Sequence, residues 1–260
     1  MSHTIRLPIA VTLWLLLTVP ASAQEWSRFR GPNGSGVSSA TTIPVRWTEK
    51  DHLWKVKLPG VGHSSPVLWG DRIFLTSGEE ESGKRFVICL RATDGGRLWT
   101  RELPGERHGK HADNSFASAT PAVDASHVYL SWATPKEYIV QALDHDGKDV
   151  WRVDLGPFKS GHGFGSSPIV HDDLVIVAND QDGKSSLVAL DRQTGKTRWQ
   201  VARQCKASYA TPVVYQPKGK PAELILTSWE LGITSIDPKT GQKNWEQDIF
   251  SKGHVETGIR

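Results

Sequence analysis

Cysteine and methionine are scarce in this chain. Cys89 and Cys205 are the only cysteines among 260 residues, and there is a single methionine. The two cysteines lie far apart and at different phases of the repeat described below, so we predict two unpaired thiols, with Cys89 on a buried strand. The spacing C-x-x-C does not occur, which removes the commonest cysteine-based metal sites.

Charge of one sign is not in excess either. The formal net charge is +3, with 31 Lys and Arg scattered among 28 Asp and Glu. Nucleic-acid binding depends on basic side chains that neutralise many phosphates. We therefore predict no nucleic-acid partner.

Long apolar runs are confined to the N-terminus, where LPIAVTLWLLLTV follows His3 and Arg6 and ends before ASA and Gln24. This is the pattern of a cleaved signal peptide, predicted over residues 1–23. The run is too short to cross a hydrocarbon core of about 30 Å as a helix, and no later run is longer, so we predict no membrane span. No cysteine follows the run to accept a lipid. The mature protein is expected in the periplasm or outside the cell.

Tryptophan, glycine and proline are abundant, at 11, 24 and 15 residues. This composition suits short strands and tight turns better than helices. No window carries a long apolar stripe with the helical period. We therefore expect an all-β protein.

An internal repeat organises the chain. A tryptophan recurs every 45 to 52 residues, at Trp54, Trp99, Trp151, Trp199 and Trp245. A Ser/Thr-Pro pair recurs in step with it, at Pro66, Pro121, Pro168 and Pro212. Each unit holds four short apolar runs, which in the third unit read SPIVH, LVIVAND, SSLVALD and TRWQVA. Four strands per unit of this length predict a β-propeller of four-stranded antiparallel blades. Each proline would begin an innermost strand, because proline cannot donate to a ladder.

The motif that ends on the repeated tryptophan is best preserved in ALDRQTGKTRW. Its Thr194-Gly195 pair predicts a hairpin between the third and fourth strands, with Gly195 at positive φ. Trp199 then lies on the fourth strand, where its ring can fill the wedge between blades and bury about 150–250 Å². Because the motif recurs in each unit, we interpret it as structural rather than catalytic.

These residues resemble the tryptophan-docking motif of the PQQ-binding-like β-propeller repeat family, A-x-D-x-x-T-G-x-x-x-W. The full match comprises Ala189, Asp191, Thr194, Gly195 and Trp199. A second copy keeps Asp237, Thr240, Gly241 and Trp245, with Ser235 in place of alanine. Looser copies keep Gly95 with Trp99, and Asp144 and Gly147 with Trp151. The resemblance runs from Leu53 to the C-terminus. WSRFRGPNGSG and GHGFGSSP also look like exported propeller proteins of planctomycete-type bacteria.

The resemblance implies one fold and two functional classes. Quinoprotein alcohol dehydrogenases of this family hold PQQ and calcium on the propeller axis, beside adjacent cysteines. Other members are not enzymes and include a lipoprotein that assists outer-membrane protein assembly. This sequence has no Cys-Cys pair and no recognisable set of acidic metal ligands. We therefore predict a binding or scaffold module without catalytic residues or cofactor. A degenerate or truncated PQQ–calcium dehydrogenase and an outer-membrane assembly helper are the alternatives, the second weakened by the lack of a lipidation cysteine.

Three loops invite a ligand-binding interpretation. DHDGKD (Asp144–Asp149) and NDQDGK (Asn179–Lys184) have alternating oxygen ligands, but neither is followed by the bidentate glutamate of an EF-hand. Both also fall where the repeat requires a hairpin, so we interpret them as turns. The glycine-rich SGHGFGSSP leads into a strand, whereas a phosphate cradle needs a helix N-terminus.

Histidines recur at one phase of the repeat. His63, His108 and His254 lie nine residues after a blade tryptophan, His162 lies eleven after, and His111 is close to His108. All fall in loops that join one blade to the next, so we predict that they share the mouth of the central channel, where they could bind a protein or a small ligand. The alternatives are capping of loop carbonyls and, for HGKH, local chelation of a metal by His108 and His111. Loops of different blades are far apart compared with Zn–N bonds of ~2 Å, so we predict no metal site.

The repeat is predicted to cover residues 53–260, after an extended segment at 24–52. HLWKVKL, at residues 52–58, looks like an outermost strand without the other three strands of its blade. DIFSKGHVETGIR repeats the loop that precedes an innermost strand. We predict four blades that form half of a seven- or eight-bladed ring, with a dimer as one way to cover the open blade face. A closed four-bladed ring is the alternative.

Overall fold

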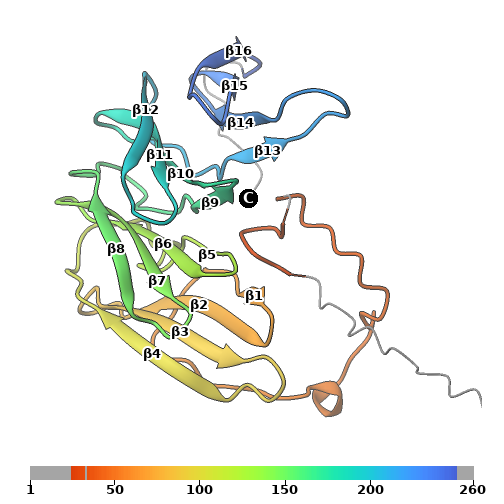
Figure 1. Ribbon diagram of the computed structural model, residues 1–260. Coiled ribbons are helices and arrows are strands. Elements are labelled where there is room, and N and C mark those ends of the chain that lie inside the picture. Colours follow the sequence, from red (N-terminus) through yellow and green to blue (C-terminus); the bar gives the residue numbers. More distant parts are fainter. Residues whose placement is uncertain (1–24, 33, 251–260) are drawn as a thin grey trace, which may run out of the picture.

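The computed structural model describes residues 25–32 and 34–250, and these form four antiparallel sheets arranged as an arc (Figure 1). Each sheet has four strands in chain order, so the predicted all-β class and the four blades are confirmed. Within the described residues the sheets do not close into a ring: the four blades follow one another along an open arc, and blade 4 does not lie against blade 1. None of the helical structure there is long and apolar enough to cross a bilayer.

The strands are short and are joined as simple meanders. Blade 1 comprises β1 (Val67–Trp69), β2 (Arg72–Gly78), β3 (Arg85–Arg91) and β4 (Arg97–Leu103), and blade 2 comprises β5 (Ala122–Val123), β6 (His127–Ala133), β7 (Tyr138–Asp144) and β8 (Asp149–Asp154). Blade 3 comprises β9 (Ile169–His171), β10 (Leu174–Asn179), β11 (Ser185–Asp191) and β12 (Thr197–Arg203), and blade 4 comprises β13 (Val213–Tyr215), β14 (Glu223–Ser228), β15 (Gly232–Ile236) and β16 (Lys243–Gln247). A 3₁₀ turn, η1 (Glu49–Asp51), precedes blade 1. Each innermost strand begins directly after a repeat proline, as predicted.

The hydrophobic core lies between the blades. The third strands of blades 1 to 3 are buried along nearly their whole length, because a neighbouring blade or segment covers each face. One cluster joins Phe74 and Val87 of blade 1 to Val128 and Leu130 of blade 2. Equivalent clusters join blades 2 and 3 and blades 3 and 4. Stability therefore depends on the packing of one sheet against the next rather than on a single sheet.

The Ser/Thr before each repeat proline links one blade to the next. The backbone N–H of Ser65 donates to the hydroxyl of Thr120 at 3.0 Å, and that of Thr120 donates to the hydroxyl of Ser167 at 2.9 Å. The N–H of Ser167 donates in turn to the hydroxyl of Thr211 at 3.2 Å. A hydroxyl is needed at this position of each blade because it satisfies a part-buried amide of the blade before it.

Each repeated indole lies beneath the hairpin glycine of the following blade. The Nε1–H groups of Trp54, Trp99, Trp151 and Trp199 donate, at 2.8–3.0 Å, to the carbonyls of Ala92, His145, Arg192 and Pro238. The facing glycines have φ between +69° and +82°, and a Cβ added to any of them would lie 2.6–3.0 Å from a ring atom: Gly95, Gly147, Gly195 and Gly241. Trp245, in the last described blade, is 44% exposed and donates to Glu223 of its own blade.

The outermost strand predicted at His52–Leu58 is not formed. This segment has no ladder partner among the described residues, and none of the four sheets includes it. Trp54 nevertheless packs its ring under Gly95 in the same way as the other repeated indoles. The predicted strand was therefore wrong. An outermost strand has to pair with a third strand of its own blade, whereas the indole of Trp54 needs only the hairpin glycine of the following blade.

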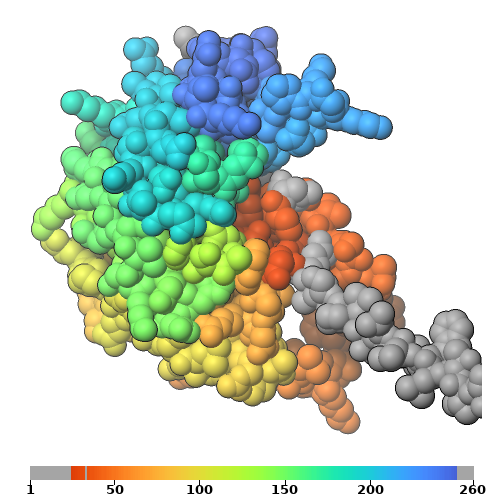
Figure 2. All heavy atoms as spheres, in the orientation of Figure 1, coloured from red at the N-terminus to blue at the C-terminus, as the bar shows by residue number. Residues whose placement is uncertain are grey.

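The N-terminal segment follows the inner edge of the arc, which the sequence pattern did not predict (Figure 2). Trp26 exchanges two backbone hydrogen bonds with Leu68 of β1, and the carbonyl of Ser27 accepts from Val123 of β5 at 2.8 Å. The buried Arg28 side chain reaches the carbonyl of Pro212, just before β13, at 2.6 Å. Three consecutive residues therefore contact three of the four blades. The predicted signal peptide, residues 1–23, lies outside the described residues.

Both cysteines are free and buried, Cys89 on β3, as predicted. Burial raises the pKa of each thiol to about 12. Only the thiolate reacts with disulfide reagents. At pH 8 the native protein should therefore not release thionitrobenzoate from Ellman's reagent, whereas the guanidinium-unfolded protein should release two equivalents. Rapid reaction of one native thiol would contradict its burial.

Candidate binding face

The loops that join successive blades lie at one end of the sheets. Each blade is a four-stranded meander, so its last strand ends at the same end at which the next blade begins, while the third-to-fourth hairpins lie at the other end. We call the end formed by residues 59–66, 104–121, 155–168 and 204–212 the loop face. The predicted site residues His63, His108, His111 and His162 all lie on the loop face. His254 lies outside the described residues.

Two of the predicted histidines meet across a blade boundary. The rings of His111 and His162 are in edge contact, with centroids 5.4 Å apart. His162 Nδ1 lies 3.0 Å from the hydroxyl of Tyr209, which also bonds the Ser160 hydroxyl at 2.8 Å. The result is an exposed cluster of two imidazoles and a phenol contributed by three successive loops.

The side chain of Asn114 connects two of the loops that form this cluster. Its amide nitrogen donates to the carbonyl of His162 at 2.6 Å and to that of Phe164 at 3.3 Å. The backbone N–H of His111 donates to the same His162 carbonyl at 3.2 Å. The loop after blade 1 is therefore held directly against the loop after blade 2.

The other two histidines lie apart from that pair. His63 Nδ1 is 3.5 Å from the Ser118 hydroxyl. His108 hydrogen-bonds the Glu106 carbonyl at 2.9 Å and packs its ring against Phe116, with centroids 5.0 Å apart. Burial lowers the pKa of His108 below its ordinary value, and the charges of Arg85 and Lys110 act in the same direction.

The local chelate considered for HGKH does not form in this arrangement, because His108 turns toward Phe116 and His111 toward His162. Within the described part of the chain, no three His, Cys, Asp or Glu side chains are grouped as metal ligands. The two acidic turns are hairpins. Asp144 accepts from the backbone N–H groups of Asp146 and Lys148, at 2.9 and 2.8 Å, and Asp180 pairs with Arg203.

Tyr209 is the member of the cluster that sequence reasoning missed. It lies ten residues after Trp199, between the nine and eleven of the histidines. Searching that phase for any aromatic side chain, instead of histidine alone, would have found it.

The inner edge of the arc bears on the alternative of a quinone cofactor. The resemblance to quinoprotein dehydrogenases implies a quinone on the propeller axis, and here residues 26–28 run along the inner strands of the blades. Cys89 lies on β3 and Cys205 in the loop after β12, both buried. We therefore derive no chemical step through PQQ or calcium.

Blades with docked tryptophans, joined by loops on one face, define a β-propeller of the PQQ-like repeat class. The sequence matches a family model described as "Outer membrane protein assembly factor BamB" over residues 48–216 and 158–260, and the chain belongs to this family.

Two solved structures illustrate the similarity. BamB from Moraxella catarrhalis is 20% identical, with a TM-score of 0.53 over 77% of this chain and 56% of that one. Quinohemoprotein alcohol dehydrogenase from Comamonas testosteroni is 15% identical, with a TM-score of 0.57 over 87% of this chain and 41% of that one. The chain thus spans about half the length of these proteins, and the likeness shows the fold alone. No curated protein matches the sequence.

Proposed function

We propose that this chain is an exported propeller module that binds a protein partner through the His111–His162–Tyr209 cluster of the loop face. The observation that carries the proposal is that three successive loops hold these exposed rings through hydrogen bonds between blades. A surface that is ordered before binding loses less conformational entropy when a partner docks. Aromatic side chains are also enriched in the cores of protein interfaces.

Membership of the BamB family favours a protein partner over a small ligand, and the signal-peptide pattern of residues 1–23 supports an encounter outside the cytoplasm. A role in outer-membrane protein assembly is the finer form of this proposal.

Site-specific photo-crosslinking tests the proposal. The photoreactive amino acid p-benzoylphenylalanine would replace Tyr209 or His111, and the full chain would be expressed with its signal peptide in the source organism. After irradiation of intact cells, each variant should give a discrete crosslinked band that mass spectrometry identifies as one and the same protein.

The matched control is the same substitution at Gln193, an exposed residue of the β11–β12 hairpin at the opposite end of the blade. It should give no such band. Equal crosslinking from Gln193, or none from Tyr209 and His111 in protein shown by circular dichroism to be folded, would overturn the proposal.

A further inference from the structure

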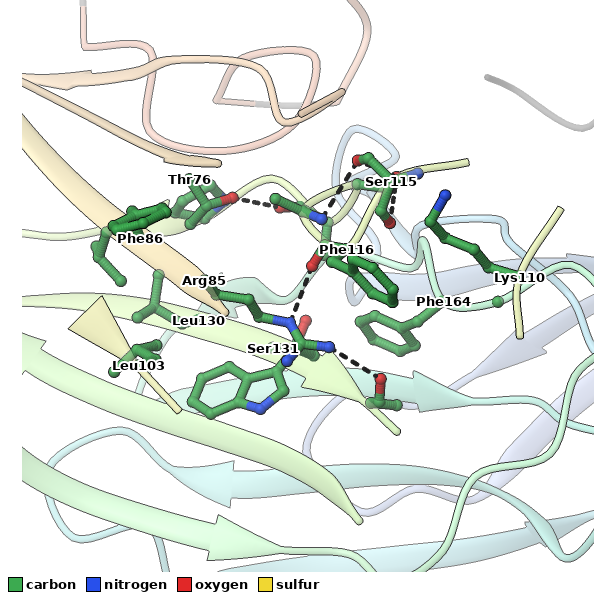
Figure 3. A pocket seen from close by; sticks show the side chains of 18 of the residues that line it. Thr76, Arg85, Phe86, Leu103, Lys110, Ser115, Phe116, Leu130, Ser131 and Phe164 are labelled. Atoms are coloured by element: carbon green, nitrogen blue, oxygen red, sulfur yellow. Dashed lines mark hydrogen bonds between the residues drawn. The ribbon is translucent and has the colours of Figure 1, made fainter. Parts of the chain in front are cut away.

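A small cavity lies between blades 1 and 2, beneath the loop that carries His108 and Phe116 (Figure 3). Its volume is about 30 Å³, and its walls include Arg85, Lys110 and Trp132. A cavity of ~10–15 Å³ measured in this way holds one water molecule, so this one can take a group of two or three heavy atoms.

Arg85 lies in the wall of this cavity, and it is a buried cation whose hydrogen-bond partners are all neutral. It is 4% exposed, and its guanidinium donates to the carbonyls of Phe116 at 2.9 Å and of Gly83 and Ala133, each at 3.4 Å. Figure 3 shows its hydrogen bond to the Phe116 carbonyl, and the ring centroid of Phe116 is 5.8 Å from the guanidinium carbon. Burial lowers the pKa of Arg85 to about 10, so the group is still charged at neutral pH.

The equivalent residue pair of blade 3 also contains a buried arginine. In blade 1, Arg85 of β3 is paired with Leu103 of β4. In blade 3, Ser185 of β11 is paired with Arg203 of β12. Arg203 is also buried but forms a two-pronged ion pair with Asp180, at 2.8 and 3.2 Å. A buried charge is costly unless it is paired. In blade 1 no Asp or Glu of the described residues lies within ion-pair distance of Arg85.

Trp132 also lines this cavity, and its indole N–H is an unused donor within the described residues. Its side chain is 93% buried, and its Nε1–H has no hydrogen-bond acceptor in the part of the chain that the structure describes. A buried indole N–H normally has a partner. An unsatisfied donor and a charged group without a counter-charge therefore line one small space.

The surrounding charges do not neutralise this space. Lys110 and His108 also line it. The nearby carboxylates each pair with another cation: Glu80 with Lys110 at 2.9 Å, Glu106 with Lys136 at 2.6 Å, and Glu137 with Arg152 at 2.8 Å. Among the described residues that line the cavity, Arg85 is therefore the cation without a paired carboxylate, and the charge of Glu137 acts on it only at longer range.

We propose that this cavity binds a carboxylate group, held by the guanidinium of Arg85 and the indole N–H of Trp132. Arginine binds carboxylates with strong, charge-assisted hydrogen bonds, and a carboxylate has the few heavy atoms that the space admits. The carboxylate belongs either to a free small acid or to the C-terminus of a peptide. The assignment does not depend on the proposed function.

The test follows the Trp132 Nε1–H resonance in protein labelled with ¹⁵N-tryptophan, with Trp132→Phe to assign the signal. Sodium acetate is titrated at constant ionic strength, balanced with the sodium salt of HEPES, whose sulfonate is too bulky for the cavity. The resonance should shift saturably with acetate. Arg85→Met should weaken binding about tenfold or more, because it removes hydrogen bonds to a charged group. Arg198→Met, which removes an exposed arginine of blade 3, should leave the acetate titration unchanged.

Arg85→Lys, which keeps the charge but loses the fork of donors, serves if the methionine variant does not fold, and it should also weaken binding. An acetylated tripeptide with a free C-terminus, compared with its amide, separates the two sources of carboxylate. Binding of the acid but not the amide assigns a peptide terminus, and binding of acetate alone assigns a free acid. The proposal is overturned if the wild-type resonance does not saturate with either probe, or if the folded Arg85 variant binds as tightly as the wild type.

Discussion

Replacing Gly195 by alanine should lower the free energy of unfolding by about 2–5 kcal/mol, measured by urea denaturation. Gly195 has φ +71°, and an added Cβ would lie 2.8 Å from Cδ2 and Cε3 of Trp151. A left-handed conformation costs a non-glycine residue about 1–2 kcal/mol, and forcing an extra carbon into a packed contact costs about 1–3 kcal/mol more. The Trp151 ring cannot move away easily, because it is 91% buried and its Nε1–H is bonded to Arg192.

Gly219→Ala is the matched control. Gly219 has almost the same φ, +72°, and none of the described atoms lies within 4 Å of the position its Cβ would take. The Gly219→Ala variant should therefore lose only about 1–2 kcal/mol of unfolding free energy, which is the cost of the left-handed backbone conformation for alanine. If the two variants lose the same amount, contact between the indole and the hairpin glycine does not stabilise the blade interface.

Removing the carboxylate of Asp180 should cost about 3–5 kcal/mol, because Arg203 is then left as a buried, unpaired charge. Asp180 is 2% and Arg203 4% exposed, and they meet through two hydrogen bonds. Asp180→Ala should therefore shift the urea midpoint strongly. The double variant Asp180→Ala with Arg203→Met should recover much of the loss, since it buries no charge.

Asp173→Ala provides the comparison on the surface. Asp173 pairs with Arg198 at 3.0 Å, but the two side chains are 59% and 48% exposed. An exposed pair contributes about 0–1 kcal/mol. If Asp180→Ala lowers the free energy of unfolding no more than Asp173→Ala does, burial does not make the Asp180–Arg203 ion pair contribute more to stability than an exposed pair.

The fold could be predicted from sequence because its markers obey local rules. Proline cannot donate to a ladder, so Pro66, Pro121, Pro168 and Pro212 mark where each innermost strand begins. The Thr-Gly turn needs positive φ, which Gly195 and Gly241 adopt. The strand expected at His52–Leu58 failed because an outermost strand depends on a partner that the segment itself does not contain.

The candidate site was only partly predictable. The shared phase of His63, His108, His111 and His162 placed them on one face, but it did not show which of them touch. Their partners come from other loops: His162 meets Tyr209, 47 residues away in the chain, and Asn114, 48 away. The repeat period assigns these residues to corresponding loops, but it does not say which side chains of neighbouring loops touch.

The sequence by itself determined the blade unit, the docked tryptophans and the face to which the joining loops belong, because these follow from backbone chemistry repeated at a regular interval. Only the tertiary structure decided the path of residues 26–28 along the inner strands, the pairing of His111 with His162, and the presence of Arg85 and Trp132 in the wall of one cavity. Those features depend on how one sheet is rotated against its neighbour, and that rotation results from the packing of many side chains together rather than from any single motif.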